Sequence, residues 1–134
     1  MPSIFVAIKN PSKADTLPND GRALILHIDA LSAIGEEAGL DRLDDYVFAP
    51  LDQIEEFLGD TGLSREELEK AHPEVWYEPV PGERLLADYI RVLEGYRTLS
   101  DSTKRQVIPE LEQFRQILEV LATEDNFWRL EYDI

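Results

Sequence analysis

The sequence contains no cysteine among its 134 residues. This absence excludes disulfide bonds, catalytic thiolates and cysteine-ligated zinc or iron–sulfur centres. No stretch approaches the roughly 18 apolar residues that a membrane-spanning helix needs. The apolar run near the N-terminus, residues 4–8, is too short for a signal peptide and has no basic leader. We therefore expect a cytoplasmic protein with a single domain, residues 1–134, because this length suits one hydrophobic core.

The sequence signatures of several enzyme classes are missing as well. We find no Gly-x-Ser-x-Gly or Ser-x-x-Lys nucleophile and no glycine-rich phosphate loop. The two histidines, His27 and His72, are far apart in sequence and have no metal-ligand spacing. Basic residues do not cluster with aromatic ones, which disfavours nucleic-acid binding. From the sequence we assign no catalytic residue, no metal and no cofactor.

Positive charge is scarce, and the excess of negative charge is uneven. The chain has 13 Lys and Arg against 28 Asp and Glu, a formal net charge of −15. From Asp29 to Glu78 alone there are 15 acidic and three basic residues. Such a segment repels nucleic-acid phosphates and anionic membranes, and it attracts cationic partners or metal ions. We therefore expect neither nucleic acid nor a membrane as a partner.

The apolar pattern predicts an α+β fold. We expect a small sheet of about three strands, near 4–8, 23–28 and 127–134, packed against about five helices. The helices are expected near 30–38, 50–58, 65–71, 81–96 and 109–122, with a turn at Pro109 before the last.

Residues 23–28 allow two interpretations. As a strand, they precede a helix that Asp29 caps and Gly39 ends. As part of one helix, they place Leu24, Ile28 and Leu31 on one stripe. We favour the strand, because Asp is a good N-cap and a poor residue inside a helix.

The middle segment supplies the candidate binding residues. Asp41, Asp44 and Asp45 form the tightest acidic cluster outside the predicted helices. A hard cation could use them, but the EF-hand order is missing, so a metal site would rest on charge density alone. Trp76 and Tyr77 are either interface anchors or a loop packed on its own core, and we favour the core. The predicted binding residues are Asp41, Asp44, Asp45, Asp52, Glu55, Glu56, Trp76 and Tyr77.

Three stretches give the chain a family likeness. They are residues 23–29 leading into 30–40, the turn at 76–79 followed by the helix at 85–96, and the aromatic terminal strand. In this layout the sequence resembles small, uncharacterised, acidic bacterial proteins. The resemblance implies an α+β fold and a bacterial cytoplasmic setting, and it implies no activity.

Our leading hypothesis is a non-enzymatic protein-interaction domain that docks a basic partner through the acidic face of residues 29–78. Immunity or antitoxin proteins that neutralise basic toxins are its most concrete form. The strand at 127–134 could lie at a sheet edge and support a homodimer.

The alternative hypothesis is a small-molecule or divalent-metal-dependent enzyme. It would use carboxylates of residues 41–56 together with His27 or His72. A pocket holding a histidine and two carboxylates would favour the enzyme, whereas a convex acidic face would favour docking.

Overall fold

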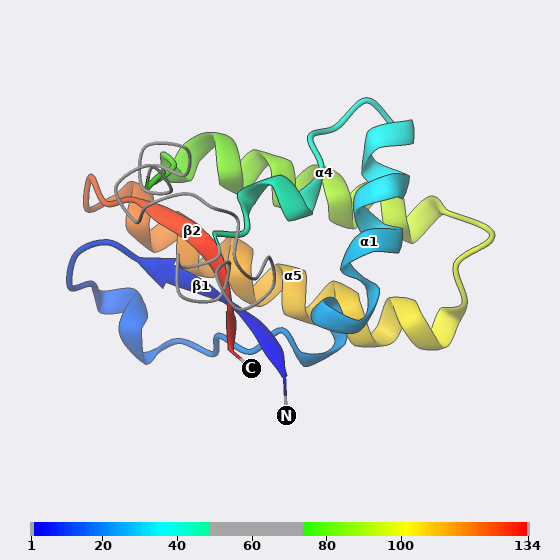
Figure 1. Cartoon of the computed structure of the whole chain (residues 1–134), viewed down its shortest axis with the longest axis horizontal. Coiled ribbons are helices and arrows are strands. Elements are labelled where there is room, and N and C mark those ends of the chain that lie inside the picture. The colour runs from blue at the N-terminus through cyan, green and yellow to red at the C-terminus, as the bar shows by residue number, and fades with distance from the viewer. Residues whose placement is uncertain (1, 49–73, 134) are drawn as a thin grey trace, which may run out of the picture.

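The first and last strands of the chain pair with each other. The computed structural model describes residues 2–48 and 74–133, in which β1 (Ser3–Ile8) runs antiparallel to β2 (Trp128–Asp133) (Figure 1). The register places Ser3 opposite Asp133 and Ile8 opposite Trp128. Between the strands lie 3-10 turn η1 (Lys13–Thr16), helix α1 (Arg22–Glu37), 3-10 turn η2 (Leu43–Tyr46), helix α4 (Pro79–Gly95) and helix α5 (Asp101–Ala122).

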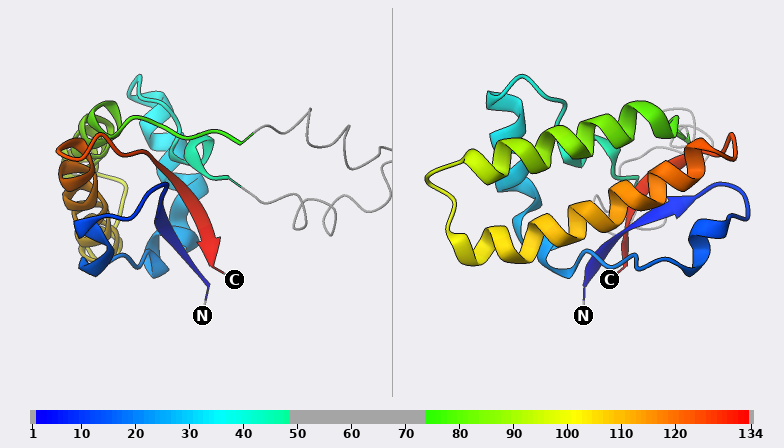
Figure 2. Two further views of the ribbon diagram at one scale, coloured as in Figure 1. Left: turned by 90° about the vertical axis from the view of Figure 1, so that its left-hand side faces the viewer. Right: turned by 180° about the vertical axis from the view of Figure 1, so that it is seen from behind.

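The core lies between one face of this sheet and the helices. Ile4 and Val6 of β1, and Trp128 and Leu130 of β2, alternate onto that face and are almost completely buried. Helices α4 and α5 lie side by side against it, and α1 packs near one end of them (Figure 2). The buried stripe of α5 is the one that the sequence predicts, and it consists of Val107, Leu111, Phe114, Ile117, Leu118 and Leu121.

The strand predicted at 23–28 is wrong, because these residues form the first turns of α1. Leu24, Ile28 and Leu31 make the buried stripe of the helical interpretation. Asp29 lies on the exposed side of the helix, where a carboxylate stays hydrated, instead of capping its start. Gly39 does end the helix region as expected: its φ is +84°, and the Leu40 N–H bonds back to the Gly35 carbonyl at 2.8 Å.

The start of α1 is held by a side chain from another helix. The N–H groups of Ala23 and Leu24 donate to the carboxylate of Glu110 on α5, with N···O distances of 3.0 and 2.9 Å to Oε1. Free N–H groups in the first turn of a helix favour a negative charge. The carboxylate of Glu110 therefore accepts the hydrogen bonds that the side chain of a local N-cap residue would otherwise accept.

The element count also differs from the prediction. The described residues contain three α-helices and a two-stranded sheet, instead of about five helices and three strands. The helices predicted at 50–58 and 65–71 lie outside the described residues. The predicted turn at Pro109 is wrong, because α5 continues through this exposed proline after a start capped by Ser100. Burial of the apolar stripe on both sides of Pro109 outweighs the one backbone hydrogen bond that a proline cannot make.

We predict that Glu110→Ala lowers the free energy of unfolding by about 1 kcal/mol, because two N–H groups at the start of α1 lose their acceptor. Urea denaturation followed by circular dichroism measures this difference. The matched control is Gln106→Ala, an exposed position on the same helix, which should change stability by less than about 0.5 kcal/mol. Equal stability of the two variants would show that the carboxylate does not hold α1.

Gly35 lets α1 approach α4 closely. A Cβ atom on Gly35 would lie 2.1 Å from Oη of Tyr89, whose side chain is fully buried and donates to the Asp41 carbonyl. Contact at that distance is impossible, so Tyr89 would have to move. The absence of a side chain at position 35 therefore fixes how α1, Tyr89 and the chain near Asp41 fit together.

Gly35→Ala should destabilise the protein by about 1–3 kcal/mol, the usual cost of overpacking a core. Thermal and urea unfolding measure the effect. Gly95→Ala is the control, because a Cβ there meets nothing within 4 Å, and it should be neutral or slightly stabilising in a helix. A Gly35→Ala protein as stable as the control would contradict the close approach.

Candidate protein-docking surface

Three of the predicted binding residues lie in and just before η2. Asp44 and Asp45 are in its first turn, and Asp41 precedes it by two residues. The turn is anchored by the buried side chain of Leu43 and by a hydrogen bond of 3.1 Å from the Asp44 N–H to Oγ of Ser32 on α1. The acidic cluster is therefore fixed to the C-terminal half of α1.

The carboxylate of Asp44 is neutralised by Arg42. The Arg42 guanidinium donates to Asp44 at 3.0 and 2.9 Å, and it also donates to Glu36 at 2.7 Å. Hydrogen bonds to Asp44 and then to Glu36 raise the pKa of Arg42 above its ordinary value. Asp44 thus serves the local structure more than it serves an external cation.

The carboxylates of Asp41 and Asp45 are exposed, and neither pairs with a Lys or Arg of residues 2–48 and 74–133. Asp41 Oδ2 accepts a hydrogen bond of 3.0 Å from the Tyr46 hydroxyl. The Asp45 carbonyl accepts one of 3.2 Å from the Tyr77 hydroxyl, which leaves its carboxylate in solvent. These two residues therefore keep a negative charge that the described part of the fold does not compensate.

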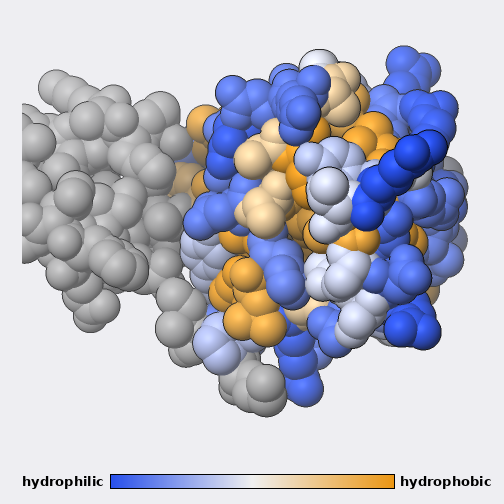
Figure 3. Space-filling model, turned by 90° about the vertical axis from the view of Figure 1, so that its right-hand side faces the viewer, coloured by the Kyte–Doolittle hydropathy of each residue, from blue (hydrophilic) through white to orange (hydrophobic). Residues whose placement is uncertain are grey.

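The exposed side of α1 extends this negative region. The pKa of Tyr132 is raised by burial first and then by the charges of Asp29 on α1 and Asp44 on η2. The charges of both elements therefore act on one phenol. We name this region the η2 acidic surface, and it comprises Asp29, Glu36, Glu37, Asp41, Asp44 and Asp45. Figure 3 shows the molecule from the right-hand side of Figure 1. On this side, hydrophilic side chains surround smaller apolar patches.

Trp76 and Tyr77 pack on the protein itself. The backbone of Tyr77 bonds to that of Trp128 in both directions, at 2.8 and 3.0 Å. The Tyr77 ring lies 4.6 Å from the Tyr46 ring, centroid to centroid, while the Trp76 ring lies 4.0 Å from the Arg129 guanidinium. These contacts agree with the interpretation we favour, a loop packed on its own core, and whether the two rings also touch a partner stays a prediction.

The outer edge of β2 is already bonded over part of its length. Besides Tyr77, the Phe48 N–H donates to the Leu130 carbonyl at 2.8 Å. A homodimer through this strand would have to displace these bonds, which makes the predicted edge less suited to strand addition.

The remaining sequence candidates contribute less. Asp52, Glu55, Glu56 and His72 lie outside the described residues. His27 is half-buried on α1. It lines neither the hollow near Glu78 and Phe127 nor the two hollows beside β1 that are described below. Among residues 2–48 and 74–133, no three His, Asp or Glu side chains are grouped so that they could hold a metal ion.

Sequence reasoning missed Asp29, Glu36 and Glu37 as members of one surface with Asp41. The signal available was the exposed side of the helical interpretation of residues 23–31, which we set aside in favour of a strand. Once α1 is a continuous helix, Asp29, Glu36 and Glu37 are exposed on it, and Glu36 is joined to the η2 turn through Arg42.

Comparisons with protein-family models, with curated proteins and with solved structures find no match for this chain. They therefore do not test the resemblance to small acidic bacterial proteins. In the part of the chain that the structure describes, no helix combines the length and the apolar character needed to cross a membrane.

The tyrosines give a pH-dependent prediction. Burial, with neighbouring carboxylates, raises the pKa of Tyr46 and Tyr89 to about 12 and raises those of Tyr77 and Tyr132 above 10. A raised phenol pKa favours the folded state while the phenol stays neutral. This stabilisation is complete below pH 10, the unfolded value, and is lost as the pH rises through about 12. Unfolding free energies measured from pH 8 to 12 should fall over that window.

The variant Asp41→Asn tests how much Asp41 contributes to the raised pKa of Tyr46. Asp41→Asn should lower the pKa of Tyr46, because the variant lacks the negative carboxylate that accepts a hydrogen bond from the neutral phenol and repels the phenolate. Absorbance at 295 nm follows tyrosine ionisation in the variant, in the parent and in an Asp125→Asn control. If the three titration curves coincide, the Asp41–Tyr46 contact does not govern that pKa.

Proposed function

We propose that this chain is a non-enzymatic interaction domain that docks a basic protein partner through the η2 acidic surface. The observation that carries the proposal is that four exposed carboxylates on α1 and around η2 are not paired with a basic residue of the described part of the chain. Asp29, Glu37, Asp41 and Asp45 have no Lys or Arg partner among residues 2–48 and 74–133. Four uncompensated charges on two elements that contact each other, α1 and the η2 turn, produce a field that a positively charged surface complements.

The physics of exposed charges defines what this surface would contribute. At physiological ionic strength such charges act over roughly 8 Å, and they speed association and select partners more than they add affinity. A toxin-neutralising immunity or antitoxin protein, which must capture a basic protein quickly, is one concrete form of this function.

We do not extend the proposal to an enzyme. The four carboxylates lie outside the hollows that we describe, and those hollows contain no histidine lining from the described residues. An exposed acidic surface supports docking better than acid–base chemistry, which needs its groups gathered around a substrate.

The test compares two triple variants that each remove three negative charges. Asp29→Asn, Glu37→Gln and Asp45→Asn neutralise the η2 acidic surface, whereas Glu78→Gln, Glu94→Gln and Asp125→Asn neutralise exposed carboxylates elsewhere. Each chain is immobilised, proteins of the native host are captured at graded salt, and the captured proteins are identified and their affinities measured.

We expect basic proteins whose dissociation constant rises about tenfold for the first variant and less than about threefold for the second, at low salt. At high salt the difference should disappear, because screening removes it. Capture of the same proteins, equally tightly, by both variants and the parent would overturn the proposal. So would partners that carry no excess of positive charge.

A further inference from the structure

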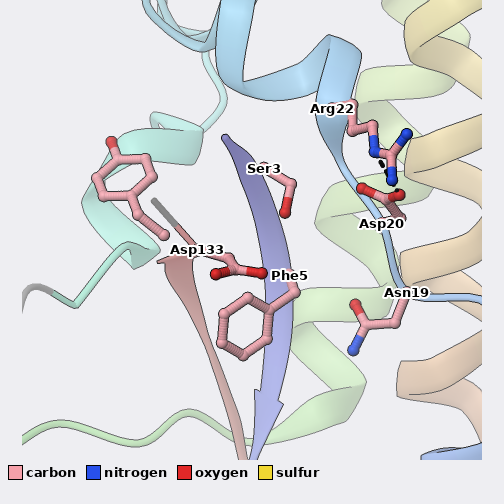
Figure 4. Close-up of a pocket in the computed structure, with 7 residues that line it drawn as sticks. Ser3, Phe5, Asn19, Asp20, Arg22 and Asp133 are labelled. Carbon is pink, nitrogen blue, oxygen red and sulfur yellow. Dashed lines mark ion pairs between the residues drawn. The ribbon is translucent and has the colours of Figure 1, made fainter. Parts of the chain in front are cut away.

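A hollow of about 630 Å³ lies beside β1, between the end of β2 and the segment that leads into α1 (Figure 4). We call it the β1 hollow. Ser3 and Phe5 of β1 form one side, with Asp133 of β2 next to them. Asn19, Asp20 and Arg22 form the opposite side. Residues from the two ends of the chain therefore meet around one concave space.

The Ser3 hydroxyl is the most unusual group in this hollow. Ser3 is only 8% exposed, and among the described residues its hydroxyl has no hydrogen-bond partner. In Figure 4 it points into the hollow, between the side chains of Asp133 and Asp20. The buried side-chain atoms without a partner among the described residues belong to Gln113 and Arg129, so the Ser3 oxygen is accessible from the hollow, and a ligand can reach it as an acceptor.

A free carboxylate lies close to this hydroxyl. Figure 4 shows the Asp133 carboxylate next to the half-buried ring of Phe5 and on the same side as Ser3. Asp133 has no Lys or Arg partner among the described residues. The hollow thus brings together a negative charge, a hydroxyl oxygen and the face of an aromatic ring, the three groups that a cation prefers.

The opposite wall is fixed before any ligand arrives. The side-chain amide of Asn19 bonds to both backbone groups of Val6, at 2.8 and 2.9 Å. Asp20 pairs with Arg22 at 2.9 Å, so the one guanidinium that lines the hollow is already occupied. A preformed wall lowers the ordering cost of binding, and the remaining charge in the hollow is negative.

We propose that the β1 hollow binds the primary ammonium group of a lysine side chain of the basic partner. The proposal rests on the docking function above. A lysine ammonium carries three donors on a compact charge. One donor reaches the Asp133 carboxylate and a second the Ser3 hydroxyl oxygen, while the Phe5 ring contacts the charge. A guanidinium suits this place less well, because its planar fork prefers two parallel acceptors of one carboxylate.

A second hollow offers room for the residues next to that lysine. It has a volume of about 370 Å³ and shares Phe5 and Asn19 with the β1 hollow. Trp76 and Glu131 also line it. The two hollows together follow the sheet face that the described helices leave uncovered, so an extended segment of the partner could occupy both (Figure 2).

The test uses pentalysine as the probe, with fully Nε-acetylated pentalysine for comparison, and measures binding to the full chain by calorimetry. Ser3→Ala should raise the dissociation constant for pentalysine at least about fivefold and should not lower the free energy of unfolding, because the hydroxyl has no partner in the free protein. Asp133→Asn should raise it about tenfold at low salt, and Asp125→Asn, an equal loss of charge elsewhere, less than twofold.

Three results would each overturn the inference: an unchanged dissociation constant in Ser3→Ala, equal effects of Asp133→Asn and Asp125→Asn, or equal binding of the acetylated peptide. The Asp29, Glu37 and Asp45 triple variant separates this outcome from the docking proposal, because none of its residues lines the hollow. It should bind pentalysine within about threefold of the parent, while its dissociation constant for the captured partner rises about tenfold.

Discussion

The pairing of β1 with β2 is the constraint on which the rest of the structure depends. It joins residues near the two ends of the sequence and brings Trp128 into the core, where its side chain is 1% exposed. The Trp128 indole N–H donates to the Glu78 carbonyl at 3.0 Å, and its ring stacks on Tyr46 at 5.3 Å. Through these contacts one strand positions both the start of α4 and the end of η2. The acidic residues of η2 therefore have a fixed place because the core requires it.

The same contacts decide which carboxylates remain available. Several of them serve the fold: Asp44 pairs with Arg42, Glu110 caps α1, and Arg115 pairs with Glu83, Glu112 and Glu119. A net charge of −15 thus overstates what a partner would meet. The exposed carboxylates of Asp29, Glu37, Asp41 and Asp45, together with Asp133 in the β1 hollow, are among those that the described residues leave uncompensated. The two proposals rest on this difference between structural and free acids.

The sequence predicts local features of this fold better than those made by distant contacts. The apolar stripes of α4 and α5, both strands at the ends and the acidic cluster at 41–45 follow from periodicity and composition. The start of α1 could not be predicted, because its cap is Glu110, 86 positions from Leu24. The β1 hollow could not be predicted either, since spacing in sequence says nothing of Ser3 lying opposite Asp133. The prediction that Asp29 caps a helix was wrong for a physical reason: a residue that makes a good N-cap is also tolerated on the exposed side of a helix.

The most direct test of the account is to map the partner on the protein by NMR, using the isotope-labelled chain with and without the captured basic protein. The account predicts that the largest changes in backbone signals lie at 29–48 and at Ser3 and Asp133, around the η2 acidic surface and the β1 hollow. Changes confined to the exposed side of α5, around Arg105 and Glu119, would contradict it, because that side has no place in either site.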